Sequence, residues 1–135
     1  MTSRAVMVDT SAYFAIIDKI DFFHSDALHF VKANTLPAVT TNYLLVETLN
    51  LISQRLGHHY AIEIGKRLFD PLKTDVIKVS DEDMLKAWHI FQRYDDKGFS
   101  FTDCTTFAVM ERLNIRSAFT FDEHFKMYGK FSVFP

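Results

Sequence analysis

The sequence predicts a single α/β domain, residues 1–135, in which a central parallel β-sheet is flanked by helices on both faces. The chain has 135 residues, of which 48% are hydrophobic, with only four glycines and three prolines, as expected for one compact domain. Short strand-like runs alternate with longer helical patterns along the whole chain. Such alternation places the strands parallel, joined by right-handed helical crossovers.

Strands are expected where short runs of β-branched and aromatic residues are bounded by turn residues. The first run ends at Asp9, and a later run ends at Asp122. The expected strands cover residues 5–8, 38–40, 75–79, 117–121 and 131–134.

Helices are expected where apolar residues recur every three or four positions between capping residues. Thr10 or Ser11 is expected to cap the first helix, Ser80 the fifth, and Gly57 and Asn114 to end helices. The expected helices cover residues 12–18, 25–34, 42–56 and 58–69, a segment after Ser80 with Met84, Leu85, Trp88 and Phe91 on one face, and a segment opened by residues 99–103 and ended by Asn114.

Composition excludes several classes of protein. A net charge of −2 argues against a nonspecific nucleic-acid binder, so any nucleic-acid contact must be local. A single cysteine, Cys104, offers neither a disulfide nor a cysteine cluster for zinc, and a buried packing role is expected for it. No apolar stretch approaches the roughly 20 residues of a membrane span, and no signal-peptide pattern opens the sequence. We therefore expect a cytoplasmic protein with no membrane partner.

Four acidic residues are candidates for a common site. Asp9 and Asp122 each follow a predicted strand, and ligands of parallel sheets bind beyond the carboxyl ends of the strands. Asp103 opens a helix near that edge, and Glu47 interrupts an otherwise apolar helical stripe between Leu44 and Leu51, which predicts a carboxylate on a buried face. Taken singly, the three aspartates also suit turns or helix starts. Because all four acids are expected at one edge of the sheet, we interpret them as a common site.

A cluster of carboxylates requires cations, because the charges repel one another. Oxygen-only ligands fit Mg²⁺ or Mn²⁺, which can activate water for phosphodiester hydrolysis. The hydroxyls of Thr10, Ser11 and Thr120 could orient a carboxylate or contact phosphate, although capping explains the first two more simply. Arg55 and Lys97 are expected to flank the edge and bind phosphates.

Four short motifs, taken in order and spacing, resemble the acidic motifs of PIN domains, particularly VapC-type toxins. They are Val8-Asp9-Thr10-Ser11, Val46-Glu47, Phe99-Ser100-Phe101-Thr102-Asp103 and Thr120-Phe121-Asp122, and the similarity covers nearly the whole chain. The resemblance implies an endoribonuclease with the four acids as its catalytic metal site, homodimers, and for toxins a cognate antitoxin. It leaves open which RNA is cut and whether the protein is a toxin or an RNA-processing factor.

Other functions fit the residues less well. A haloacid-dehalogenase-type phosphatase needs a second aspartate where Ser11 stands, and a receiver domain needs an acidic pair and a strand-end lysine. A noncatalytic RNA- or protein-binding module with the same fold is the main alternative. The six histidines show no ligand spacing, so surface or packing roles are expected for His24, His29, His58, His59, His89 and His124.

Overall fold

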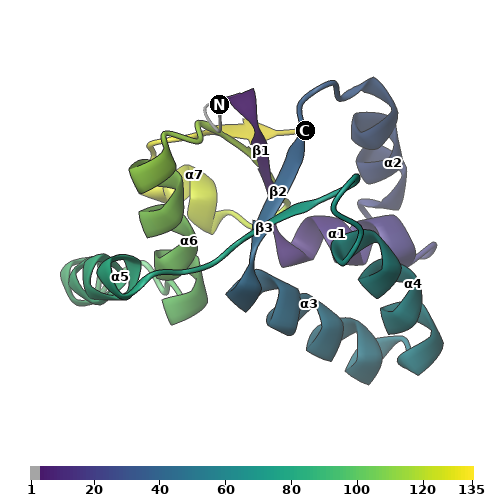
Figure 1. Ribbon diagram of the computed structural model, residues 1–135, viewed down its shortest axis with the longest axis horizontal. Coiled ribbons are helices and arrows are strands. Elements are labelled where there is room, and N and C mark those ends of the chain that lie inside the picture. Colours follow the sequence, from purple (N-terminus) through teal and green to yellow (C-terminus); the bar gives the residue numbers. More distant parts are fainter. Residues whose placement is uncertain (1–3) are drawn as a thin grey trace.

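The computed structural model describes residues 4–135 and contains a five-stranded, fully parallel sheet with the strand order β3-β2-β1-β4-β5. The predicted fold class is confirmed: one α/β domain whose sheet is covered on both faces (Figure 1). The strands are β1 (Val6–Val8), β2 (Ala38–Thr41), β3 (Asp75–Ile77), β4 (Ser117–Phe119) and β5 (Ser132–Phe134).

Two strands end two residues earlier than the sequence predicts, and in both cases side chains capture the backbone. Beyond β3, the N–H of Val79 donates to the side-chain carbonyl of Asn42 at 2.9 Å. Beyond β4, the N–H of Phe121 donates to the Ser11 hydroxyl at 3.0 Å. At both strand ends the backbone N–H therefore bonds a side chain instead of a neighbouring strand, and the spacing of apolar residues does not reveal such a bond.

The helices agree with prediction to within a few residues, with one addition, α7, which the sequence analysis missed. Within residues 4–135, no helix is long and apolar enough to cross a membrane. The helices are α1 (Thr10–Ile17), α2 (His24–Ala33), α3 (Asn42–Arg55), α4 (His58–Leu68), α5 (Asp81–Arg93), α6 (Phe101–Leu113) and α7 (His124–Tyr128).

The caps of the helices were predicted with one error. Asp9, not Thr10 or Ser11, is the N-cap of α1, because its carboxylate accepts from the Ser11 N–H. The capping role of Ser80 and the helix end at Asn114 are as predicted, and Asn114 ends its helix in the left-handed conformation. Gly57 has a positive φ of 115°, and it stands between α3 and α4.

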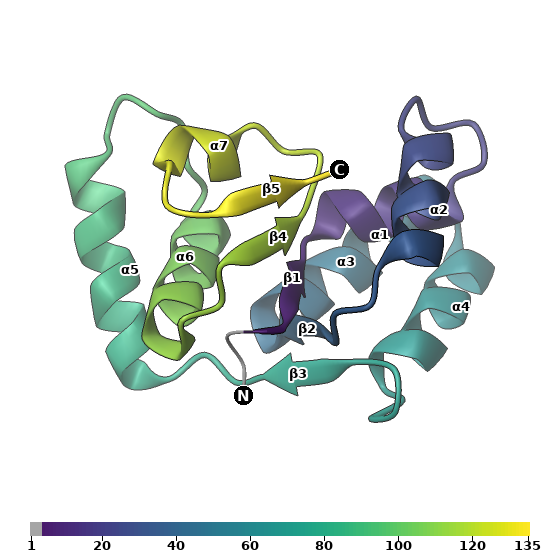
Figure 2. The same cartoon turned by 90° about the horizontal axis from the view of Figure 1, so that it is seen from above.

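Side chains alternate between the two faces of the sheet and build a separate core on each. Met7 and Ala118 point into a core shared with α5, α6 and α7, which includes the buried Cys104. Val8 and Phe119 point into the core formed with α1, α2 and α4. Figure 2 shows these two groups of helices on either side of the strands.

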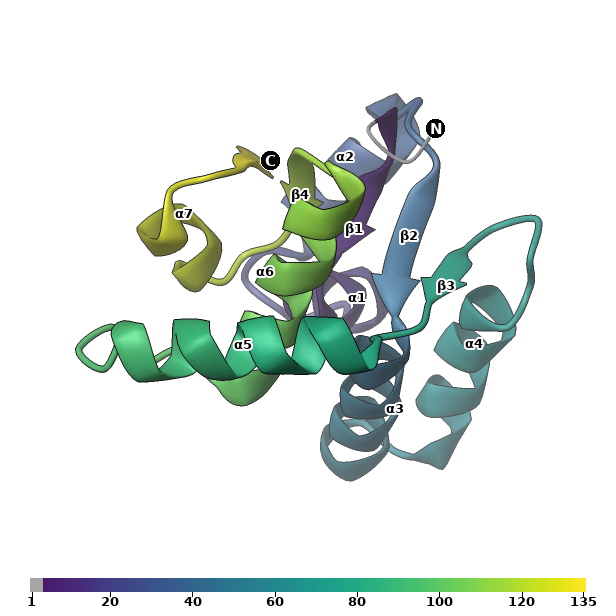
Figure 3. The same ribbon diagram turned by 60° about the vertical axis from the view of Figure 1, so that its left-hand side comes forward.

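Helix α5 does not pack through the apolar face that the sequence predicts. Trp88 and Leu85 are exposed, whereas Asp83 and Ala87 are buried. Helix α5 packs against α6, which lies beside it in Figure 2 and crosses behind it in Figure 3. Asp83 closes a capping box with Ser80, and Arg112 of α6 donates to both of its carboxylate oxygens at 2.7 and 2.8 Å. A paired charge thus occupies the packed face, which an apolar pattern cannot predict.

The Asp83 pair provides a stability test. Asp83→Asn removes the charge that the Arg112 fork binds and weakens the capping box, so we expect the free energy of unfolding to fall by about 1–3 kcal/mol. Asp81→Asn is the matched control, since Asp81 is an exposed acid in the first turn of the same helix. Urea unfolding measures both; equal losses in the two variants would contradict the assignment.

Candidate metal centre

The carboxyl edge of the sheet brings Asp9 and Asp122 to neighbouring positions. The last residues of β1 and β4, Val8 and Phe119, are partners in the parallel ladder, and the Asp9 N–H donates to the Phe119 carbonyl at 3.1 Å. Asp9 follows β1 directly, and Asp122 follows β4 after Thr120 and Phe121. The sequence-based placement of these two acids at one edge is therefore what the structure shows.

The Asp9 carboxylate is buried and held by two hydroxyls. Its Oδ2 atom accepts from Ser11 Oγ and from Thr120 Oγ1, each at 2.8 Å. The two hydroxyl oxygens are themselves 3.1 Å apart. Ser11 and Thr120 thus orient a carboxylate in this structure, one of the two roles that the sequence suggested.

The environment of Asp9 makes its carboxyl a weaker acid than an exposed aspartic acid, with a raised pKa. Burial raises the pKa of Asp9 from 3.8 to about 6. The hydrogen bonds from Ser11 and Thr120 act in the opposite direction, and the charges of Asp122 and Asp103 raise the pKa further. The three acids therefore interact electrostatically, as a shared cation site requires.

Asp103 combines a structural contact with a contact in the site. It closes a capping box with Ser100 at the start of α6: Oδ2 accepts from the Ser100 N–H, and the Ser100 hydroxyl accepts from the Asp103 N–H, both at 3.0 Å. The same Oδ2 lies 2.7 Å from Nδ1 of His124. Burial raises the pKa of Asp103, and the nearby charge of Asp122 adds to the effect. The helix-start interpretation is confirmed, and the same carboxylate also faces His124.

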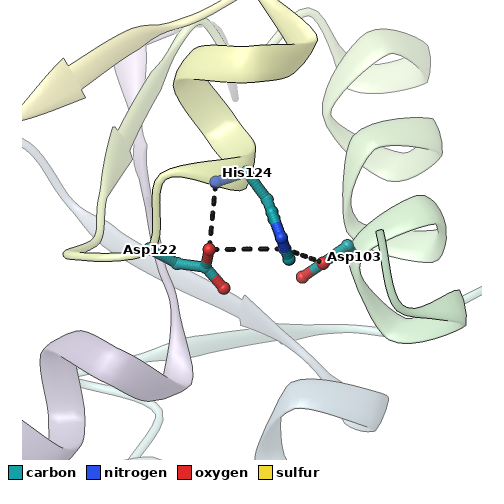
Figure 4. A group of neighbouring side chains, drawn as sticks. All are labelled: Asp103, Asp122 and His124. Atoms are coloured by element: carbon teal, nitrogen blue, oxygen red, sulfur yellow. Dashed lines mark hydrogen bonds and ion pairs between the residues drawn. The ribbon is translucent and has the colours of Figure 1, made fainter. Parts of the chain in front are cut away.

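His124 is the residue that sequence reasoning missed. Its Nδ1 lies between two carboxylates, 2.7 Å from Asp103 Oδ2 and 3.3 Å from Asp122 Oδ1, while its backbone N–H donates to Asp122 Oδ1 at 2.9 Å (Figure 4). His124 also packs edge to face against Phe99, with ring centroids 5.4 Å apart, so the expected packing role holds but leaves out these two carboxylate contacts. The Asp122-x-His124 spacing after a strand is the signal that could have indicated it, since a two-residue offset lets both side chains face one point.

Glu47 does not lie on a buried face, so that expectation is wrong. The buried stripe of α3 consists of Leu44, Thr48 and Ile52, and Glu47 is exposed, one position round the helix from Thr48. Thr48 Oγ1 is 2.9 Å from Thr10 Oγ1, which joins α3 to the start of α1 next to Asp9. The hydroxyl of Thr10 therefore links two helices, and Glu47 lies beside that link.

The two predicted phosphate-binding cations lie at the end of α3 and in the connection from α5 to α6. Arg55 is the last residue of α3, exposed, and eight residues after Glu47, which corresponds to about 12 Å along a helix. Lys97 lies in the connection from α5 to α6, with its Nζ 4.0 Å from the Asp96 carboxylate. Neither belongs to the group of converging ligand atoms.

The donor set fits a divalent cation. Asp103, Asp122 and His124 each offer one ligand atom, and these atoms lie within 4.8 Å of one another. Carboxylates are the ligands that Mg²⁺ and Mn²⁺ prefer, while an imidazole is bound more readily by transition metals than by Mg²⁺. The buried Asp9 adds a third carboxylate whose charge reaches the group.

Comparison with known proteins identifies the family. The model of the PIN domain family matches residues 6–130. The chain belongs to the PIN-domain family. This confirms the resemblance drawn from the four acidic motifs.

PIN-domain proteins of two organisms are similar in sequence over nearly the whole chain. The 23S rRNA-specific endonuclease VapC20 of Mycobacterium tuberculosis is 31% identical over 131 residues, which span 96% of this chain and 98% of that protein. A VapC ribonuclease of Archaeoglobus fulgidus is 28% identical over 131 residues, spanning 91% of this chain and 80% of the relative.

PIN-domain structures agree closely with the fold. The crystal structure of M. tuberculosis VapC20, described as a Sarcin-Ricin loop cleaving toxin, superposes with a TM-score of 0.88 at 31% identity and covers 97% of this chain and 100% of that one. A chain of a toxin–antitoxin complex from Klebsiella pneumoniae reaches a TM-score of 0.69 at 14% identity, covering 97% of both chains, which supports the fold alone.

The raised pKa of Asp9 predicts a pH-dependent stability. Below about pH 4 the carboxyl is neutral in both the folded and the unfolded state; between about pH 4 and 6 the unfolded state loses the proton first, so this contribution to stability is lost as the pH rises. Asp9→Asn cannot ionise. We expect its stability in EDTA, relative to the parent, to rise by up to about 3 kcal/mol from pH 4 to pH 7.

Urea unfolding at several pH values in EDTA measures this difference, and Asp81→Asn serves as the exposed control. A stability difference between Asp9→Asn and the parent that stays constant across this pH range would contradict the prediction.

Proposed function

We propose that this PIN-domain protein is a metal-dependent endoribonuclease that hydrolyses RNA phosphodiester bonds. The observation that carries the proposal is the convergence of Asp103, Asp122 and His124 beside the buried Asp9, at the edge of the sheet where such folds bind ligands. The names of the two relatives, an rRNA-specific endonuclease and a ribonuclease, support the same activity.

The unused carboxylate oxygens indicate how the acids would bind the metal. The hydrogen bonds to Asp9 and Asp103 involve Oδ2, and those to Asp122 involve Oδ1. We therefore propose that Oδ1 of Asp9, Oδ1 of Asp103 and Oδ2 of Asp122 are the metal-facing atoms. When bound, Mg²⁺ or Mn²⁺ lowers the pKa of a coordinated water and stabilises charge on the leaving oxygen.

Neighbouring residues hold the acids of this site in position. Ser11 and Thr120 fix the Asp9 carboxylate through its Oδ2 atom, so that the acid does not have to be ordered when RNA arrives. His124 holds Asp103 and Asp122 together through Nδ1. Glu47, exposed in the second turn of α3, is proposed as the fourth acid, reaching the metal from the solvent side.

Partners follow from the activity and from the family. The names of the two relatives support RNA as the substrate. The VapC20 toxin and the toxin–antitoxin complex from Klebsiella pneumoniae support a cognate antitoxin as the protein partner, with a toxin of a toxin–antitoxin pair as the biological role. The homodimer implied by the resemblance stays a prediction.

The metal requirement can be tested directly. EDTA should abolish cleavage of structured and unstructured RNAs by the purified protein, and added Mg²⁺ or Mn²⁺ should restore it, because the carboxylates alone cannot generate the attacking hydroxide. Cleavage is followed on gels with each metal titrated separately. Full activity in excess EDTA would overturn the metal mechanism, and no cleavage with either metal would favour a noncatalytic binding module.

Amide substitutions separate site acids from structural ones. Asp9→Asn, Glu47→Gln, Asp103→Asn and Asp122→Asn should each lower metal-dependent cleavage by about 100-fold or more, since even residues that only support metal ligands change activity by 10- to 100-fold. Asp81→Asn, at the start of α5, should cut at the parental rate.

Thermal unfolding in EDTA accompanies each assay. If Glu47→Gln melts at a lower temperature and still cuts RNA at the parental rate, Glu47 has no place in the site.

Phosphate contacts are expected at Lys97 and Arg55. Charge reversal to glutamate should weaken RNA binding while leaving folding intact, and should reduce the salt dependence of affinity by about 0.7 in log–log slope per lost single-strand contact. Lys32→Glu is the control, because Lys32 is exposed in the last turn of α2 and precedes β2, at the opposite edge of the sheet. Unchanged salt-dependent affinity in both variants would refute these contacts.

A further inference from the structure

Three phenylalanine rings form a continuous aromatic stack next to the acidic group. Phe23 and Phe121 are stacked, with ring centroids 4.5 Å apart and an interplanar angle of 15°. Phe22 contacts Phe23 edge to face at 5.0 Å. We call Phe22, Phe23 and Phe121 the aromatic stack. It joins the connection between α1 and α2 to the segment after β4 that carries Asp122.

The aromatic stack is held in place and yet open to solvent. Behind it, Phe121 contacts the buried ring of Phe119 at 6.0 Å. The N–H of Phe23 donates to the Asp21 carboxylate at 2.9 Å, which fixes the connection. Phe22 nevertheless is 89% exposed. An ordered, exposed aromatic ring next to a functional edge indicates a binding surface, because such apolar area is usually buried.

A cavity joins the aromatic stack to the candidate metal centre. It has a volume of about 380 Å³, and its walls include Phe23 and Phe121 on one side and Thr120 and Asp122 on the other. Thr120 and Asp122 are the residues that orient Asp9 and contact His124, respectively. A group bound at the stack would therefore be next to the phosphate at the metal centre.

The charges around the cavity favour a base over a phosphate. Asp26, Asp122 and Glu123 line it, against the single ammonium of Lys126. Carboxylates repel phosphate oxygens but accept hydrogen bonds from the N–H groups of nucleobases. Aromatic rings offer every base a stacking surface, provided that the base is unpaired.

We propose that the aromatic stack binds an unpaired nucleobase of the RNA substrate, adjacent to the phosphodiester that is hydrolysed. This inference rests on the proposed ribonuclease function. The base stacks on the exposed ring of Phe22 and meets Phe23 edge to face, since the two rings are perpendicular, with its hydrogen-bond donors toward Asp26 and Glu123. The aromatic stack thereby selects RNA that is single-stranded at the cleavage point.

The test uses the full chain and a fluorescein-labelled single-stranded RNA that the parental protein cuts with Mg²⁺ or Mn²⁺. Phe22→Ala and Phe23→Leu should bind this RNA in EDTA about 5- to 100-fold more weakly, and should raise KM while changing kcat little. Ile20→Ala is the matched control, because Ile20 lies on the same connection and is 92% exposed but not aromatic.

A double-mutant cycle locates the base. An abasic site placed beside the cut bond should weaken binding to the parent, and should have little further effect on Phe22→Ala, because both changes remove the same contact. Additive losses, or parental affinity in both phenylalanine variants, would overturn the proposal and assign the surface to an apolar protein segment. A parental protein that cuts no RNA with either metal is a separate outcome, which refutes the ribonuclease function itself.

Discussion

The burial of neighbouring carboxylates at one edge of the sheet is the constraint on which the rest of the structure depends. Parallel pairing of β1 with β4 places Asp9 and Asp122 next to each other, and α6 adds Asp103. Burial raises the pKa of Asp9 to about 6, and the two other acids add to that shift. Such a group weakens the fold at neutral pH unless hydrogen bonds and a cation compensate for it.

The surrounding residues supply that compensation with hydroxyls and one imidazole instead of arginine or lysine. Ser11 and Thr120 donate to Asp9, and His124 bridges Asp103 and Asp122. The hydroxyl donors lower the cost of burying the Asp9 carboxylate without cancelling its charge. These carboxylates could therefore still be offered to a divalent cation, whereas a guanidinium in the same place would neutralise one of them.

The positions of the strand ends, read from the sequence, were sufficient to predict part of this site. Asp9 and Asp122 follow short apolar runs, and parallel topology requires neighbouring strand ends to meet. Glu47 was misplaced because the buried stripe of α3 contains Thr48, a polar residue satisfied by Thr10 across the fold. The polarity of Thr48 alone could not show that its hydroxyl contacts Thr10, which lies 38 positions earlier in the chain.

His124 and helix α7 were missed for a related reason. A five-residue helix is too short to show periodicity, and the contacts of His124 with Asp103 depend on how α6 and α7 pack. The exposed aromatic face of α5 was misread in the same way, because Asp83 is buried only by virtue of Arg112, 29 residues later. Polar contacts between residues far apart in the sequence are the part of the fold that the local sequence pattern cannot predict.

Two helices begin with the same capping box, but the aspartates of the two boxes have different surroundings. Ser80 with Asp83 opens α5, and Ser100 with Asp103 opens α6. Burial alone would raise the pKa of Asp83, but hydrogen bonds from Arg112 and Ser80 hold it below its usual value, so this acid is a permanent ion-pair partner.

Asp103 makes the same backbone contacts and has the opposite electrostatics. Burial is the largest influence and raises its pKa, the hydrogen bonds from Ser100 and His124 lower it, and the charge of Asp122 raises it, so that the pKa stays above its usual value. The carboxylate of Asp83 therefore forms an ion pair with Arg112, whereas the carboxylate of Asp103 lacks a strong counter-charge. The same local sequence, Ser-x-x-Asp, fixes a helix start in both places, and the partner across the fold decides which of the two can hold a cation.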